Sequence, residues 1–396
     1  MLILSGSIGA GHHVAAQAIA ESLHKADPTL TIEIADFFVT FKNIIATATK
    51  KIYLNTLKLS PRMYELLFAE TRDRAWTVKI LNHLADAFMH RKLMRFLQEK
   101  KPRMLISTFP IWNLLLGKAW EDYSNGNGNG TSGEIPVEHV EHNTKHLPPR
   151  QFPFISFITD TNTVHCAWAL GDADYYIVSN NQTRHALHEQ GVPLKKIKPL
   201  GYPVALEFTQ STPRAEFLES IQLRPTAFTA LVIISNVIRT KKITTLLKKL
   251  AQYRAPDFQA IFIAYGVNDE VLHSLQEIKW PFPTHVSGWT NELHHYMNAA
   301  DLVLTKAGGN TIMQCIYAKK PLMIIDVLPG QEEGNALLVQ QSGCGIIAQD
   351  TYDNVAEGID QIRINHKNFT RNASRLSKPN AMADITTFLL SLLKSA

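Results

Sequence analysis

Cysteine is scarce in this 396-residue chain, which contains only Cys166, Cys315 and Cys344. The three lie far apart without the spacing of a metal site, so we assign them no chemistry and expect a reducing compartment. The sequence also lacks a signal-peptide pattern and any run of about 18 apolar residues, which argues against a spanning helix. We therefore expect a protein that is cytoplasmic or bound to the membrane from that side.

A large net charge is also missing, since the whole chain carries only +5. The positive charge is concentrated in residues 37–104, where fourteen Lys and Arg against five Asp and Glu give +9 and leave the rest at −4. No helix-turn-helix or zinc-finger pattern accompanies this segment, so we expect no nucleic-acid partner. Apolar residues such as Ile45 and Tyr53 interleave with Lys50 and Lys51, which predicts contact with an anionic membrane surface. The alternative is a helix whose apolar face packs on its own domain.

Short apolar segments alternate with helical patterns along the chain, which predicts an α/β fold with parallel, doubly wound sheets. The length favours two domains, which we place at residues 1–204 and 205–396. The Ser-, Asn- and Gly-rich residues 124–133 are expected to form a flexible loop in the first domain. An apolar last helix, residues 385–393, is expected to pack back on that domain. The predicted strands are residues 2–4, 31–34, 104–108, 154–159, 175–179, 230–235, 260–265, 302–305 and 321–326.

The first predicted strand runs into the glycine-rich residues 5–11, and a helical pattern begins there with His12 and His13. Such a strand–turn–helix unit exposes backbone N–H groups and lets a ligand approach closely. Consecutive helical side chains point in different directions, so only one histidine faces a given ligand, and we favour His12. A tight turn without a binding role is the alternative.

A second unit of the same kind follows strand 302–305, with Gly308 and Gly309 in the turn and Asn310 as the expected helix N-cap. Ligands of open α/β sheets bind at the carboxyl ends of the strands, so the two glycine turns are expected to face a shared cleft. Just beyond, residues 328–335 cluster amides and carboxylates that suit the hydroxyl groups of a sugar.

These stretches together resemble the monogalactosyldiacylglycerol synthase and processive diacylglycerol glucosyltransferase family, which belongs to glycosyltransferase family 28. The likeness extends from the first strand to about Gly345, and its five motifs occur in the family's order. The motifs are Gly9-Ala10-Gly11-His12 with Ala15-Ala16, Thr159-Asp160 with His165 and Trp168, Gly288-Trp289-Thr290-Asn291, Thr305-Lys306-Ala307-Gly308-Gly309, and Pro329-Gly330-Gln331-Glu332 with Asn335.

The resemblance implies a GT-B fold, in which two Rossmann-like domains face a cleft, and transfer of a hexose from a UDP-sugar to a membrane lipid, with diacylglycerol as the expected acceptor. It implies that His12 is the base and Asp160 an acidic residue of the cleft, while Gly9 and Gly11 make room for the acceptor. Tyr64 lies in the implied acceptor- and membrane-facing region. We expect the UDP-sugar to be a substrate, with no cofactor and no metal. The expected donor-binding residues are Lys306, Gly308, Gly309, Asn310, Gln314, Gln331, Glu332 and Asn335.

Two departures from the family pattern concern the donor. The family usually has an acidic residue in the helix after its second glycine turn, where it accepts hydrogen bonds from the ribose, and this chain has Gln314. An amide oxygen lacks the charge that strengthens such bonds. The family also expects a glycine-bearing loop after strand 230–235, whereas residues 236–240 contain no glycine.

These departures leave a second interpretation open, namely a non-catalytic protein of the same fold that binds a UDP-sugar or a membrane. The joint presence of His12 and Asp160 argues against it, since a binding module needs no acceptor-side base. A lipid-linked N-acetylglucosaminyltransferase is a further alternative. A UDP-sugar epimerase on the same fold is another, although it leaves the basic, apolar segment without a use.

We predict that residues 37–104 attach the protein to anionic membranes in a salt-dependent manner. A basic residue near an anionic surface contributes about 1 kcal/mol, screened over about 8 Å at physiological ionic strength. Replacing Lys50, Lys51 and Lys58 together by Glu should therefore release the protein from anionic vesicles in a pelleting assay. Unchanged pelleting of the triple variant, or pelleting insensitive to salt, would contradict this role.

Overall fold

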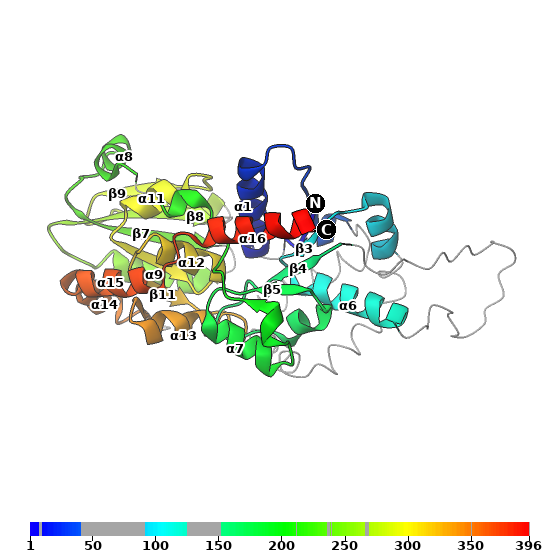
Figure 1. Ribbon diagram of the computed structural model, residues 1–396. Coiled ribbons are helices and arrows are strands. Elements are labelled where there is room, and N and C mark those ends of the chain that lie inside the picture. Colours follow the sequence, from blue (N-terminus) through cyan, green and yellow to red (C-terminus); the bar gives the residue numbers. More distant parts are fainter. Residues whose placement is uncertain are drawn as a thin grey trace, which may run out of the picture.

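Two α/β units lie side by side in the computed structural model, each built around one parallel six-stranded sheet (Figure 1). This arrangement confirms the predicted fold class. The structure describes residues 1–7, 10–40, 92–124, 152–210, 212–235, 238, 240–265, 269–349 and 351–395.

The first sheet has the strand order β2-β1-β3-β4-β5-β6, and every neighbouring pair is parallel. All residues of its central strands β1, β3 and β4 are buried, as in parallel sheets covered on both faces. The strands are β1 (Leu2–Ser5), β2 (Glu33–Asp36), β3 (Leu105–Ser107), β4 (Phe154–Phe157), β5 (Tyr175–Ile177) and β6 (Ile197–Lys198).

The second sheet has the order β12-β11-β10-β7-β8-β9 and is also parallel throughout. Its two longest strands pair in register along their whole length, from Phe228 opposite Phe258 to Ser235 opposite Tyr265. The strands are β7 (Phe228–Ser235), β8 (Phe258–Tyr265), β9 (Thr284–Ser287), β10 (Leu302–Lys306), β11 (Leu322–Asp326) and β12 (Gly345–Ile347).

Helices cover both faces of each sheet, and residues 92–100 are helical as well. On the first sheet they are α1 (Ala10–Ala26), α2 (Phe37–Thr40), α6 (Pro110–Ser124), η1 (Cys166–Gly171), α7 (Asn181–Glu189) and η2 (Leu194–Lys196). The helices that follow along the chain are η3 (Leu206–Phe208), α8 (Arg214–Ser220), α9 (Thr240–Leu250), α10 (Asp269–Glu277), α11 (Leu293–Ala299), α12 (Gly309–Tyr317), α13 (Glu333–Ser342), α14 (Val355–Ile364), α15 (His366–Leu376) and, back on the first sheet, α16 (Ala381–Ser395).

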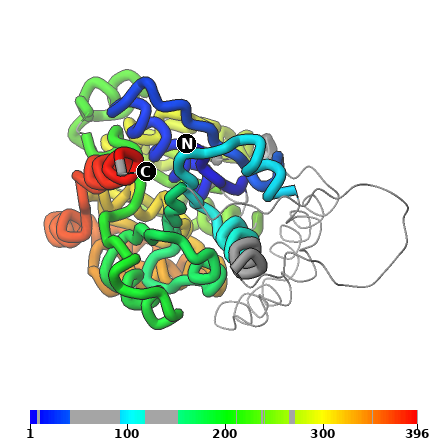
Figure 2. The backbone as a smooth tube through the Cα atoms, turned by 45° about the vertical axis from the view of Figure 1, so that its right-hand side comes forward, coloured from blue at the N-terminus to red at the C-terminus, as the bar shows by residue number. Residues whose placement is uncertain are grey.

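The last helix, α16, leaves the second unit and packs on the first sheet. Its buried residues Ile385, Leu389 and Leu393 join a core that contains Ile3 of β1 and Ile19 of α1. Figures 1 and 2 both show α16 in red beside α1, with the two chain termini close together. Residues near both ends of the chain therefore belong to the first unit.

The chain crosses between the two units at residues 199–204 and again at residues 377–381, and the two crossings contact each other. Lys378 Nζ donates to the carbonyl of Pro199 at 2.7 Å. Gly201 has a φ of +123°, and a Cβ there would lie 2.5 Å from the Cβ of Ala381. Glycine is therefore required at position 201 by both conformation and space.

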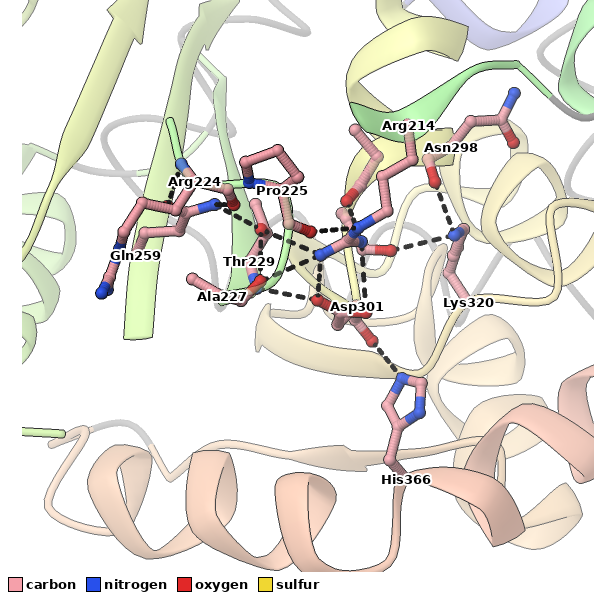
Figure 3. Close-up of polar contacts among 12 residues, drawn as sticks. Arg214, Arg224, Pro225, Ala227, Thr229, Gln259, Asn298, Asp301, Lys320 and His366 are labelled. Carbon is pink, nitrogen blue, oxygen red and sulfur yellow. Dashed lines mark hydrogen bonds and ion pairs between the residues drawn. The ribbon is translucent and has the colours of Figure 1, made fainter. Parts of the chain in front are cut away.

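A polar network fastens α8, which follows the first crossing, to the base of the second sheet (Figure 3). The guanidinium of Arg214 donates to both carboxylate oxygens of Asp301, at 2.8 and 3.2 Å, and to the carbonyls of Ala227 and Ala299. Asp301 also accepts from the backbone N–H of Thr229 at 2.8 Å. Arg214 thus joins the segments that lead into β7 and β10.

We predict that Arg214→Lys lowers the free energy of unfolding by about 1.5–3 kcal/mol, because an ammonium group cannot replace the fork of charge-assisted bonds. Chemical denaturation measures the change. Arg224→Lys is the matched control, since Arg224 Nη2 makes one exposed bond, to the carbonyl of Pro256. Equal effects of the two substitutions would contradict the role given to the network.

Candidate active site

Three neighbouring parallel strands bring polar residues together at one edge of the first sheet. His12 follows β1, Thr108 follows β3, and Thr159 and Asp160 follow β4. The strands β1, β3 and β4 are adjacent and parallel, so their carboxyl ends meet at the same edge. The sequence motifs indicated His12, Thr159 and Asp160, whereas Thr108 was missed.

His12 lies in the first turn of α1 and is held through one ring nitrogen. Its Nδ1 lies 2.8 Å from the carbonyl oxygen of Thr108 and 2.9 Å from Oγ1 of Thr159. A carbonyl only accepts hydrogen bonds, so we assign the imidazole proton to Nδ1. In this tautomer Nε2 carries the free lone pair, which is the arrangement of a general base.

The surroundings of His12 favour its neutral form. The ring packs edge-on against Phe109 at a centroid distance of 5.0 Å, and Trp168 lies 6.3 Å away. Burial lowers the pKa of His12 to about 4, and the hydrogen bond to the Thr108 carbonyl opposes this shift. The imidazole is therefore unprotonated at neutral pH and able to accept a proton.

Asp160 lies in the same cluster and is held by two donors. Its Oδ2 accepts from Trp168 Nε1 at 2.8 Å and from the backbone N–H of His165 at 3.2 Å. Burial raises the pKa of Asp160 to about 6, while the two hydrogen bonds lower it by less. The group is a carboxylate at neutral pH that regains its proton in mild acid. His165 also caps η1, where its side chain accepts from the backbone N–H of Ala167, and Trp168 is buried in the same element.

The second glycine turn lies at the start of α12, directly against the first unit. The helix begins at Gly309 with Gly308 as its N-cap residue, and no side chain caps it. The prediction that Asn310 is the N-cap was therefore wrong, because the helix starts before that residue. A Cβ on Gly309 would lie 3.1 Å from the carbonyl oxygen of Thr159, and a Cβ on Gly11 would lie 3.6 Å from the Cβ of Asn310. The starts of α1 and α12 thus face each other.

Lys306 lies over this turn and pairs with Glu332. A Cβ on Gly308 would come within 3.0 Å of Lys306 Nζ, which places the ammonium beside the turn. Its partner is Oε1 of Glu332, while Oε2 of Glu332 accepts from the backbone N–H of Leu328 at 3.1 Å. Glu332 is buried and Gln331 is half-buried next to it. The cation and the N–H groups of the helix start make this turn suitable for an anion.

Asn335, the last predicted donor residue, lies between the two units. Its Nδ2 donates to the carbonyl of Ala307 at 2.9 Å, and its Oδ1 accepts from the hydroxyl of Thr161. Both ends of the side chain are therefore engaged with the protein. Thr161 is a contact that the sequence did not reveal, because a threonine in a loop gives no signal of its own.

Asn310 and Gln314 lie one turn apart on α12 and present amide oxygens without a hydrogen-bond partner among the described residues. Both oxygens, Asn310 Oδ1 and Gln314 Oε1, are buried, and the Gln314 residue is only 5% exposed. Unpaired buried acceptors are costly, so each can accept from a hydroxyl or N–H group of a ligand. His13 contributes a third such atom, its Nδ1.

Several predicted features lie outside the described residues. They are Gly9, Tyr64, residues 125–133 of the predicted flexible loop, and most of the basic segment. Of the glycine-free stretch 236–240, the structure describes only Ile238, which is buried, and Thr240.

The chain contains one Asp-x-Asp tripeptide, Asp172-Ala173-Asp174, at the amino end of β5 and thus away from the glycine turns. Asp172 pairs with Lys196 at 2.8 Å, and Asp174 accepts from the backbone N–H of Phe154 at 2.8 Å. Their contacts are structural. Within the described ranges no group of three or more His, Cys, Asp or Glu is arranged to hold a metal ion.

A cavity of about 480 Å³ opens between the two units beside this site. Its walls come from the start of α7 and from helices α12, α13 and α15. None of the predicted catalytic or donor residues lines it, so the cavity does not mark the chemistry. Gly309, Gly334 and Asn335 instead make close contacts with residues 159–163 of the first unit.

The two parallel six-stranded sheets form the fold of the GT-B glycosyltransferases. Residues 12–119 and 136–204 match the family model of monogalactosyldiacylglycerol (MGDG) synthase, and residues 235–387 match the glycosyltransferase family 28 C-terminal domain. The chain belongs to the monogalactosyldiacylglycerol synthase family within glycosyltransferase family 28.

Relatives of known name support the assignment. The processive diacylglycerol beta-glucosyltransferase of Staphylococcus epidermidis is 26% identical over 366 residues, which are 91% of this chain and 83% of the relative. Monogalactosyldiacylglycerol synthase 2 of Arabidopsis thaliana is 24% identical, with 97% of this chain and 79% of the relative covered.

Solved structures share the fold at low identity. Acinetobacter baumannii MurG superposes with a TM-score of 0.56 at 12% identity, covering 98% of this chain and 99% of that one. The UDP-GlcNAc 2-epimerase of Neisseria meningitidis, bound to UDP-GlcNAc, gives 0.57 at 12% identity, covering 100% and 99%. Since the fold serves transferases and epimerases alike, the family match and not the fold carries the assignment.

We predict that Gln314→Glu tightens UDP binding by about fivefold to tenfold, because a charged acceptor roughly doubles the strength of a hydrogen bond from a ribose hydroxyl. The melting temperature of the free variant should fall, since the new carboxylate is buried without a cation. Calorimetry of UDP binding measures the first effect. Gln314→Leu, which removes the acceptor, should weaken binding, and equal or weaker affinity in Gln314→Glu would contradict the contact.

Proposed function

We propose that the protein transfers a hexose from a UDP-sugar to the free hydroxyl of diacylglycerol at the cytoplasmic surface of a membrane. The observation that carries this proposal is the environment of His12, whose Nδ1 is held by Thr108 and Thr159 while Nε2 keeps its lone pair. The residue before His12, Gly11, lies close to Asn310, so the start of α1 lies beside the start of the helix that follows the second glycine turn.

In the proposed reaction His12 Nε2 removes the proton of the acceptor hydroxyl. The acceptor oxygen forms a bond to the anomeric carbon of the sugar, and the bond from that carbon to the diphosphate breaks, which releases UDP. Asp160, as a carboxylate, favours the imidazolium that forms. The N–H group of Gly309, the dipole of α12 and the Lys306 ammonium stabilise the charge on the leaving diphosphate.

Lys306 is paired with Glu332 before any donor binds. When a diphosphate binds, the Lys306 ammonium gains a second anionic partner. Oε1 of Glu332 can then also accept a hydrogen bond from a sugar hydroxyl. The arrangement therefore holds both groups ready without leaving a buried charge unpaired. This supports the donor roles of Lys306 and Glu332.

The membrane location rests on the basic, apolar residues 37–104, most of which lie outside the described ranges. No helix in the described part of the chain is long and apolar enough to cross a membrane. We propose that the protein binds the membrane surface through this segment and takes its acceptor there.

The transfer assay uses purified protein, vesicles that contain diacylglycerol, and labelled UDP-glucose, UDP-galactose or UDP-N-acetylglucosamine, followed by separation of the lipids. We expect labelled glycolipid from a UDP-hexose only when diacylglycerol is present. Product from UDP-N-acetylglucosamine alone would favour the lipid-linked N-acetylglucosaminyltransferase. UDP binding without transfer would favour a non-catalytic protein.

We predict that His12→Ala lowers kcat by about 10² to 10⁴ while the affinity for UDP and the melting temperature stay close to the parent's, because only the proton transfer is lost. His13→Ala is the control at the neighbouring position and should lose much less. A well-folded His12→Ala protein that transfers sugar at the parent's rate would show that His12 has a packing role alone.

A further inference from the structure

The residues that follow β4 contact both the base and the second unit. The hydroxyl of Thr159 lies 2.9 Å from Nδ1 of His12. The carbonyl oxygen of the same residue lies against Gly309, where a Cβ would be 3.1 Å away. Thr159 therefore touches the proposed base with its side chain and the donor turn with its backbone.

A second connection runs through Thr161, two residues further on. Its hydroxyl donates to Oδ1 of Asn335, whose Nδ2 donates to the carbonyl of Ala307, immediately before Gly308. Thr161 and Asn335 are 1% and 6% exposed, so water does not compete strongly for these bonds. One side chain thus links residue 161 to the backbone of the donor turn.

The start of α13 closes the third side of this segment. A Cβ on Gly334 would lie 2.6 Å from the carbonyl oxygen of Thr161 and would also meet the hydroxyl of Thr163. Such packing leaves no room for residues 159–163 to move independently of α12 and α13. Close-packed contacts of this kind transmit small displacements.

We propose that Thr159 and Thr161 are positioning residues that set the orientation of the His12 ring according to the position of the donor turn. The inference rests on the proposed function, in which His12 is the base. The hydrogen bond between Thr161 and Asn335 holds residues 159–163 against the second unit. The hydroxyl of Thr159 contacts Nδ1 of His12, so the position of this segment sets the orientation of the ring. A hydrogen bond weakens steeply with angle, so a small shift of the segment turns Nε2 away from the acceptor.

The competing interpretation treats these contacts as packing that holds the two units together. Under that interpretation, substitutions change stability, while the state of His12 does not depend on Thr161 or on UDP. The two interpretations predict different results, because only the positioning role makes the His12 ring respond to a substitution of Thr161.

The kinetic test compares Thr161→Val, which removes the hydroxyl with little change of shape, with Thr161→Ser, which keeps it. For Thr161→Val we expect kcat to fall about tenfold to a hundredfold, since the tie is lost and the buried Asn335 oxygen is left unpaired. Its dissociation constant for UDP should stay within about threefold, because the proposed role of Thr161 acts on the base and not on the binding of the nucleotide. Thr161→Ser should keep the parent's kcat within about threefold. Equal kcat in the two variants would overturn the proposal.

A second readout does not depend on sugar transfer. The ¹⁵N shifts of the His12 imidazole, assigned with His12→Gln, report the hydrogen bonding of Nδ1. In the parent protein we expect UDP to shift these signals, and in Thr161→Val we expect the response to UDP to be lost. An identical response in both proteins would overturn the positioning role.

The two readouts separate this inference from the proposed function. A parent protein that transfers no sugar but shows the UDP response contradicts the proposed function alone. Full transfer by Thr161→Val contradicts the positioning role alone. Melting temperatures are measured for all variants, and if Thr161→Val does not fold, Thr161→Ala removes the same hydroxyl and takes its place in both tests.

Discussion

The hydrogen bond from His12 Nδ1 to the carbonyl of Thr108 is the interaction on which the chemistry of this site depends. It fixes the tautomer, and the tautomer decides which nitrogen is free to act as a base. The bond exists because β1 and β3 are adjacent and parallel, so that the residue after β3 lies beside the first turn of α1. A return hydrogen bond from the Thr108 hydroxyl to the backbone carbonyl of His12 closes the contact.

Burial and charge divide the site into two parts with different electrostatics. On the first unit, an imidazole whose pKa is lowered to about 4 lies near a carboxyl whose pKa is raised to about 6, so both groups are driven by burial toward neutrality. On the second unit, Lys306 and Glu332 form an ion pair. In the proposed function a donor diphosphate binds beside Lys306, which already has Glu332 as its partner.

Most of the fold could be predicted because long parallel strands show their burial directly in the sequence. Strands such as β7 and β8 are eight residues of nearly continuous apolar character. Strands β6, β9 and β12 were not predicted, because they have two to four residues and too little pattern to distinguish them from loops.

The candidate site, too, could be predicted only where the local sequence has a recognisable pattern. Motifs indicated His12 and Asp160, whose catalytic roles remain predictions, while the contacts of Thr108 and Thr161 depend on strand neighbours and on the second unit, which local sequence does not encode. The N-cap at Asn310 was wrong for a similar reason, since a glycine in extended conformation starts α12 earlier.

The packing of α16 on the first sheet has a consequence for the order in which the molecule is assembled. In topological terms, the second unit is an insertion between β6 and α16, because the chain leaves the first unit after β6 and returns only at its last helix. Ile3, Ile106, Ile155 and Ile177 share their core with α16 and stay incompletely covered until residues 385–393 have been synthesised. By then every strand and helix of the second unit has already been made. The core of the first unit is therefore completed last, although its first strand is made first.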